Sequence, residues 1–244
     1  MREKEIINDF NNLIAKNIAV NQLKENSKIV KFEKHFIKEL ATDSRLEFNI
    51  TRDISIIQDD LIYTTGILFT LRPYINNALN ESINYMGQPR VTYFQNMFDS
   101  LYLMYASFCF EKLYNFWDRI GDKIANEFPD DFKDPKSIMF ANVIQKIRNT
   151  KFDDNNIKWL IDFKDTEFKD FNEKRKIVVH YEQIESKYKK LFLDNINDKQ
   201  IIENNWIEKS TLPEFFKKHI EMTNEGIKNT YEFVVNNKGG IRTQ

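Results

Sequence analysis

The sequence is poor in the residues that make tight turns and cross-links. Its 244 residues include six glycines, five prolines, three histidines and a single cysteine. One cysteine, Cys109, excludes an internal disulfide and a cysteine-rich zinc site. Sheets joined by tight hairpins place glycine at their turns, and glycine usually makes up about 7% of a protein. The shortage of glycine and proline therefore favours long helices over a sheet.

Neither sign of charge is in excess, although 30% of the residues are charged. The 36 basic and 37 acidic residues leave a formal net charge of −1. This balance argues against a protein that binds nucleic acid by bulk electrostatic attraction, but it leaves room for a local site. The chain is 41% hydrophobic and 14% aromatic, which excludes a disordered protein.

Long apolar runs are also missing. A membrane-spanning helix needs about 20 consecutive apolar residues, and the most apolar stretch, 97–117, is interrupted by Asp99, Glu111 and Lys112. The first five residues are mostly charged and lead into no apolar signal core. We therefore expect a soluble, cytoplasmic protein that does not associate with a membrane.

Apolar residues instead recur at the three- and four-residue spacing of helices. This pattern predicts helices over 6–18, about 29–40, 53–85, 91–128, 136–149, 157–182 and 211–237. Residues 43–52 lack the pattern and are expected to be a linker or a short extended piece. We expect Pro73 to interrupt the helix over 53–85 and Thr211 to cap the last helix. The stretch 183–210 is mixed, and no segment shows a clear strand pattern.

The sequence thus predicts an all-α protein, a helical bundle with an extra N-terminal helical region. We divide it into an N-terminal helical extension over 1–50 and the bundle over 51–244. The apolar residues of 91–128 cover more than one face of the predicted helix, which is typical of a helix at the centre of a bundle or in a dimer interface.

Most familiar catalytic signatures are missing from the sequence. His35, His180 and His219 form no metal-binding pair, and no Glu-x-x-His motif is present. There is no P-loop, no G-x-G-x-x-G loop and no G-x-S-x-G elbow. We therefore expect neither a metal nor another cofactor. Cys109 and Trp117 are expected in the core.

One arrangement remains, in the segment 171–182 (FNEKRKIVVHYE). Arg175 and His180 are separated by four residues, three of them apolar. This R-x4-H pattern, late in an all-α sequence, resembles the signature of the HEPN superfamily. The segment 110–122 (FEKLYNFWDRIGD) resembles the long aromatic helix of a bacterial HEPN subfamily. The resemblance covers about residues 53–244.

HEPN proteins are helical domains, and many are metal-independent endoribonucleases. The resemblance implies that Arg175 and His180 are catalytic, and that a homodimer brings two motifs into one cleft that cleaves RNA by 2′-hydroxyl attack. Histidine titrates near neutral pH and can move protons, and arginine offers a fixed fork of donors to phosphate. Lys176 and Lys174 are expected to contact RNA phosphate. The resemblance also implies a toxin or anti-phage effector, with an antitoxin or defence-complex protein as partner.

Two features depart from the family pattern. The residue after the arginine is often Asn, His or Asp in the family, and here it is Lys176. Some HEPN toxins carry a tyrosine two residues after the histidine, and a partner enzyme modifies it. This chain has Glu182 at that position, so control by tyrosine modification is not expected.

Five residues along a straight helix turn by about 500° and leave Arg175 and His180 about 140° apart. The helix must therefore end or bend near Val179, or Arg175 must reach round it.

A structural interpretation of the same residues stays open. Arg175 would pair with a nearby carboxylate, Glu173 or Asp170, and His180 would cap the helix end. The basic runs 174–176 and 187–190 would then be solvated surface instead of phosphate contacts. In that case the protein is a non-catalytic HEPN-like binding module or a subunit of a larger defence complex.

Overall fold

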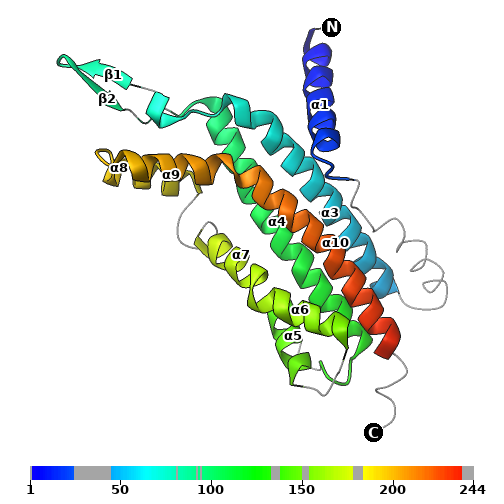
Figure 1. Ribbon diagram of the computed structural model, residues 1–244. Helices are drawn as coiled ribbons and strands as arrows, with labels where there is room; N and C mark the ends of the chain where they lie inside the picture. Colours follow the sequence, from blue (N-terminus) through cyan, green and yellow to red (C-terminus); the bar gives the residue numbers. More distant parts are fainter. Residues whose placement is uncertain are drawn as a thin grey trace. The chain divides into compact units, whose positions relative to one another are not determined.

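The computed structural model describes residues 2–24, 45–80, 82–91, 93, 95–132, 138–149, 154–177 and 184–237. These residues are helical apart from loops and one short hairpin, which confirms the all-α class (Figure 1). The α-helices are α1 (Arg2–Val20), α3 (Arg45–Leu71), α4 (Met97–Glu127), α5 (Phe140–Arg148), α6 (Asn155–Asp165), α7 (Glu167–Lys176), α8 (Ile184–Asp194), α9 (Lys199–Ser210) and α10 (Leu212–Asn237). The predicted helix over 29–40, with His35, lies outside the described residues.

The chain divides into two compact units, each assembled from three separate stretches. The first unit comprises Met1–Lys24, Ile62–Glu111 and Lys174–Lys218, and the second comprises Glu25–Leu61, Lys112–Glu173 and His219–Gln244. The longest helices, α3, α4 and α10, each contribute residues to both units. The division into an extension over 1–50 and a bundle over 51–244 stays a prediction.

In the first unit, α1 packs against the C-terminal part of α3. Ile14 and Ile18 of α1 are buried there. Gly66 of α3 allows this close approach, since a Cβ atom at this position would lie 2.6 Å from Ile18 Cγ1. Next to it, the side-chain amide of Asn17 donates to the Thr70 hydroxyl over 3.0 Å. The helix predicted over 6–18 is therefore present and is fixed to the unit by its C-terminal half.

An aromatic core fills the second unit. Trp117 of α4 is fully buried, and its ring lies 5.0 Å from that of Phe140 and 4.1 Å from that of Phe163. Gly226 of α10 faces the same indole, because a Cβ atom there would lie 2.5 Å from it. The buried Gln58 side chain of α3 donates to Asn224 of α10 over 2.7 Å. The prediction that Trp117 belongs to the core is confirmed.

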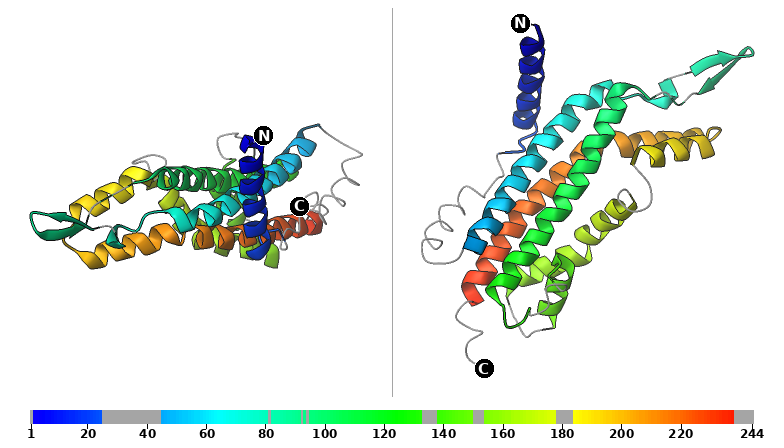
Figure 2. Two further views of the ribbon diagram at one scale, coloured as in Figure 1. Left: turned by 90° about the horizontal axis from the view of Figure 1, so that it is seen from above. Right: turned by 180° about the vertical axis from the view of Figure 1, so that it is seen from behind.

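The short hairpin was not apparent in the sequence. Strands β1 (Ser82–Tyr85) and β2 (Gln88–Val91) pair in antiparallel register beyond the ends of α3 and α4 (Figure 2). Met86 and Gly87 form the two-residue turn with φ values of 53° and 80°, the combination that a type I′ turn requires. Four-residue strands are too short for a clear alternating pattern. Before the hairpin, Pro73 lies in the short 3₁₀ helix η1 (Arg72–Tyr74) that follows α3, so its interruption of the helix is confirmed.

Several helix boundaries and one cap differ from the predictions. Helix α3 begins at Arg45, so the linker or short extended piece predicted over 43–52 is wrong from that residue onward. Helix α4 begins at Met97 and not at residue 91. The helix predicted over 157–182 is divided at Thr166 into α6 and α7. The Thr211 hydroxyl donates to the Ile207 carbonyl of α9 over 2.7 Å. This side chain therefore closes α9, and only the Thr211 carbonyl serves the first turn of α10, where it accepts from Phe215.

One helical stretch of the described chain, Ile50–Asn80, is long and apolar enough to cross a membrane by length and composition alone. Most of this stretch is buried inside the protein, which is typical of a core helix of a soluble protein. The cytoplasmic location stays a prediction.

Candidate functional site

The basic run 174–176 forms the last turn of α7. Positive charge at this end of a helix is favourable, because the unpaired carbonyl groups there carry partial negative charge. Lys174 is exposed, whereas Arg175 and Lys176 are half-buried and interact with other groups of the protein. Helix α7 ends at Lys176, before Val179. His180 lies outside the described residues, so its approach to Arg175 stays a prediction.

Lys174 lines a cavity of about 120 Å³ in the first unit. The walls come from the end of α7, the start of α8 and the junction of α9 with α10. The side chains that line it are Phe110, Lys174, Ile184, Lys187, Tyr188, Glu208, Thr211, Leu212 and Phe215. The segment that carries His180 joins Lys174 on one wall to Ile184 on another.

Two lysines bring positive charge to the cavity, which we call the lysine cavity. The Lys174 ammonium lies 4.8 Å from the centre of the Phe215 ring, a cation–π contact that holds the charge over an aromatic floor. The Lys187 ammonium lies 2.7 Å from a carboxylate oxygen of Glu208. Among the described residues, no carboxylate forms an ion pair with Lys174. Its charge is therefore available to an anion.

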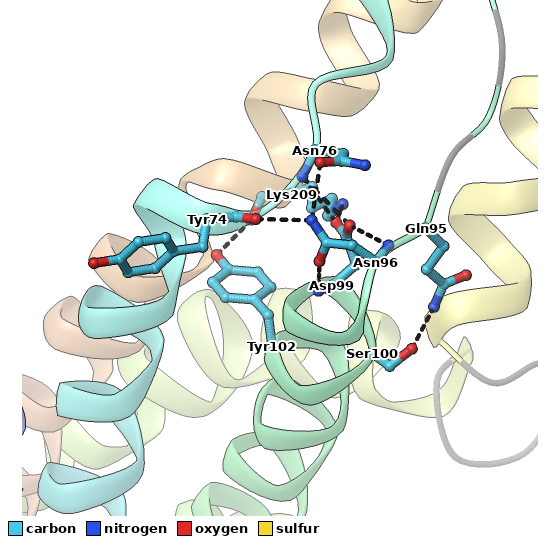
Figure 3. A network of polar contacts seen from close by, with 8 residues as sticks. All are labelled: Tyr74, Asn76, Gln95, Asn96, Asp99, Ser100, Tyr102 and Lys209. Atoms are coloured by element: carbon cyan, nitrogen blue, oxygen red, sulfur yellow. Dashed lines mark hydrogen bonds and ion pairs between the residues drawn. The ribbon is translucent and has the colours of Figure 1, made fainter. Parts of the chain in front are cut away.

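A buried ion pair lies at the start of α4, in the same unit as the lysine cavity. The Asp99 carboxylate is almost fully buried and pairs with the Lys209 ammonium of α9 (Figure 3). The backbone N–H groups of Asn76 and Asn96 donate to the same carboxylate over 3.2 and 3.0 Å. The Tyr102 hydroxyl donates to the Lys209 carbonyl over 2.7 Å. These bonds fix the end of α9 to the start of α4.

This network is not apparent from the sequence, although one of its parts has a local signature. The Asn96 side chain accepts a hydrogen bond from the Asp99 N–H over 2.9 Å, while the Asp99 carboxylate accepts one from the Asn96 N–H. This reciprocal pair is the capping box, here with the spacing N-x-x-D. The spacing could have predicted the start of α4 near residue 97. The partner Lys209, more than a hundred residues away, leaves no such signal.

Two tyrosines near this network are kept in their neutral form. Burial, together with the nearby Asp99 and Glu185 carboxylates, raises the pKa of Tyr93 to about 12. Burial also raises the pKa of Tyr188 well above its ordinary value, with Glu208 adding to the effect. Tyr188 lines the lysine cavity, so the phenol there is an uncharged hydrogen-bonding group.

A wider groove of about 440 Å³ lies in the second unit, between α3 and α4. Asp118 and Arg119 of α4 are among the residues that line it. Arg119 pairs with Asp122 over 2.6 Å and approaches Asp53 to 3.7 Å. Asp118 accepts a hydrogen bond over 3.3 Å from the Phe140 N–H, at the start of α5. These charges therefore hold elements of this unit together.

Cys109 and His219 are both buried. Cys109 is fully buried and lies 3.2 Å from the Thr64 hydroxyl, and burial raises its pKa to about 12. Its predicted place in the core is confirmed. His219 is buried beside the ring of Phe171, with 5.5 Å between ring centres. Across the described parts of the chain, no three His, Cys, Asp or Glu side chains are grouped so that they could hold a metal ion.

The sequence of this chain matches the model of a known protein family. The model of the family described as HEPN_Cthe2314-like HEPN matches residues 60–235. The matched stretch runs from the middle of α3 to the end of α10 and leaves α1 outside. No curated protein and no solved structure gave a match. The matched length covers well over half of the 244 residues. HEPN domains are helical, and ribonucleases are common among them. The chain therefore belongs to this HEPN family.

Proposed function

We propose that this HEPN protein is a metal-independent endoribonuclease with Arg175 and His180 as its catalytic pair. The observation that carries the proposal is the R-x4-H spacing at the end of α7 in a chain that belongs to the HEPN family. The lysine cavity adds a positively charged side chain, Lys174, beside the same helix end.

RNA supplies its own nucleophile, the 2′-hydroxyl next to each phosphodiester. In the proposed reaction a histidine removes the 2′-hydroxyl proton, the 2′-oxygen attacks phosphorus, and the 5′-oxygen leaves with a proton. The products are a 2′,3′-cyclic phosphate and a 5′-hydroxyl. Arg175 stabilises the negative charge that develops on the phosphorane oxygens. Lys176 and Lys174 bind neighbouring phosphates.

One histidine cannot act as base and acid at the same moment. A symmetric homodimer would supply two copies of His180 and of Arg175 to one composite cleft, and we propose this arrangement. The biological role that follows from the family resemblance is a toxin or anti-phage effector in the cytoplasm, restrained by an antitoxin or by a protein of a defence complex.

The proposal is tested by incubating the wild-type protein and the variants Arg175→Ala and His180→Ala with total RNA in EDTA. We expect the wild type to cleave, and each variant to lose at least about 10²-fold in rate, since general acid–base catalysis contributes roughly 10²–10⁴-fold. Arg148→Ala is the matched control, because it removes an exposed arginine that pairs with Asp165 in the second unit. Light scattering should give twice the 29.3 kDa chain mass.

Retained cleavage in both variants would contradict the assignment of Arg175 and His180. A wild-type protein that binds RNA without cleaving it would favour the second candidate, a non-catalytic HEPN-like binding module.

A further inference from the structure

A second, smaller cavity lies on the other side of Tyr188 in the first unit. Its volume is about 40 Å³, which is room for roughly three water molecules. Helices α8 and α9 provide most of its walls, and the chain around Asn76 and Tyr93 closes it. The lining side chains are Asn76, Ala78, Tyr93, Tyr188, Phe192, Ile202, Asn205, Trp206 and Lys209. We call it the aromatic cavity, because four of the nine residues that line it are aromatic.

The aromatic cavity is uncharged. Its only lysine, Lys209, is neutralised by the buried carboxylate of Asp99. Tyr93 and Tyr188 are protonated at neutral pH, as any phenol is, and burial raises the pKa of both further from that range. An anion or a carboxylic acid would find no charge to pair with here, so the cavity suits a neutral, flat molecule.

One buried polar group in the wall of the aromatic cavity makes no hydrogen bond with the described residues. The side-chain Nδ2 atom of Asn205 is buried and makes no hydrogen bond with the described residues. Leaving a buried donor unsatisfied is unfavourable, and a ligand with an acceptor oxygen or nitrogen would relieve that cost. Trp206, next to it on α9, is half-buried and offers a large ring on which a flat molecule can stack.

Tyr188 connects the two cavities, since its side chain lines both. On one side lie the ammonium groups of Lys174 and Lys187, and on the other lie the aromatic rings and the Asn205 amide. A nucleotide has the same two parts, a charged phosphate and a neutral flat base. Single-stranded RNA is usually recognised by stacking its unpaired bases on aromatic side chains and by hydrogen bonds to their edges.

We propose that the aromatic cavity binds one unpaired base of the RNA substrate while the lysine cavity holds the adjoining phosphate. The small volume admits only the edge of a base, and the single ring of a pyrimidine enters it more readily than a purine does. The Asn205 amide donates to a carbonyl oxygen of the base, and Trp206 and Tyr188 provide the stacking surfaces. This inference rests on the proposed function for the identity of the ligand, and it defines the substrate as single-stranded, pyrimidine-containing RNA.

The test measures binding of octauridylate and octaadenylate by fluorescence anisotropy, in a His180→Ala background that prevents cleavage. Asn205→Leu keeps the size of the side chain and removes its donor. We expect it to weaken octauridylate binding at least about fivefold, as for the loss of one buried hydrogen bond. Asn204→Leu is the matched control, because Asn204 is the exposed neighbour on the same helix, and it should bind like the parent. Circular dichroism verifies that all three proteins are folded.

A second readout locates the base directly. Octamers that contain 4-thiouridine should crosslink, on irradiation, to the peptide that carries Asn205 and Trp206, or to Tyr93. Equal octauridylate affinity in the parent and Asn205→Leu, preference for octaadenylate, crosslinks elsewhere or no binding at all would each overturn the inference. Cleavage by the wild type without dependence on Asn205 would refute the base site alone. Asn205-dependent binding by a protein that never cleaves would refute the nuclease alone.

Discussion

At the scale of single residues, the first unit contains a buried ion pair between Asp99 and Lys209. Lys209→Met would leave the Asp99 carboxylate buried without its counter-ion. We expect this variant to lose about 3–5 kcal/mol of unfolding free energy, the typical cost of breaking a buried ion pair. Urea unfolding followed by circular dichroism measures the loss.

The matched control is Arg72→Met, which breaks the ion pair of Arg72 with Glu214. Both side chains of this pair are more than a third exposed, so we expect a loss of less than about 1 kcal/mol. Similar losses in the two variants would show that the burial of Asp99 does not decide the energy.

Residue type predicted burial well where the side chain is large and apolar. Trp117 and Cys109 lie in the core as expected, because the free energy of transfer from water depends on the residue itself. The surroundings of polar residues could not be predicted in the same way. His219 is buried and the Nδ2 atom of Asn205 lies in a cavity wall, and both facts depend on helices that are distant in the sequence.

At the scale of elements, the contact of α4 with α5 depends on a glycine. A Cβ atom at Gly121 would lie 2.8 Å from the backbone nitrogen of Phe140, and backbone cannot move aside as a flexible side chain can. We expect Gly121→Ala to lose about 1–2 kcal/mol of unfolding free energy, because the clash outweighs the helix propensity that alanine adds. Thermal unfolding and urea titration measure the effect.

Asn115→Ala is a suitable comparison for this prediction. Asn115 is an exposed residue in the same helix, so alanine there gains helix propensity without meeting another element. We expect no loss of stability for this variant. A stabilised Gly121→Ala protein would mean that α5 moves away from α4 at little cost.

Helix identity was easier to predict than helix ends. The periodic apolar residues predicted α1, α4 and α10, since a long helix repeats its signal many times. The break at Thr166 escaped prediction because neither glycine nor proline marks it. The Thr166 hydroxyl and N–H both donate to the Asp162 carbonyl, over 2.7 and 3.0 Å, and so satisfy the end of α6 locally. Many sequences can provide such a contact, so it is not a reliable signal.

At the scale of the whole molecule, several buried acidic protons make the fold sensitive to alkali. Burial raises the pKa of Cys109 from 9.0 to about 12 and raises the pKa values of Tyr102 and Tyr188 above 10.0. Between these values the unfolded chain has released protons that the folded chain keeps. The unfolding free energy should therefore be constant below about pH 9 and fall above it, by up to about 1.4 kcal/mol per pH unit for each group.

Urea midpoints between pH 7 and pH 11 test this dependence. Tyr188→Phe and Cys109→Ala each remove one titrating proton, so their stability should fall less steeply above pH 9 than that of the wild type. A midpoint that does not change up to pH 11 would contradict the burial of these groups.

The sequence by itself determined the fold class and the family. Scarce glycine and proline with helical periodicity predicted an all-α protein, and the R-x4-H pattern with the aromatic segment indicated HEPN, because both signals are local and repeat or cluster along the chain. Only the tertiary structure decided that Tyr188 lies between a charged and an aromatic cavity and that Lys209 neutralises Asp99. Such contacts join residues far apart in sequence, and their energies depend on burial, which no local pattern records.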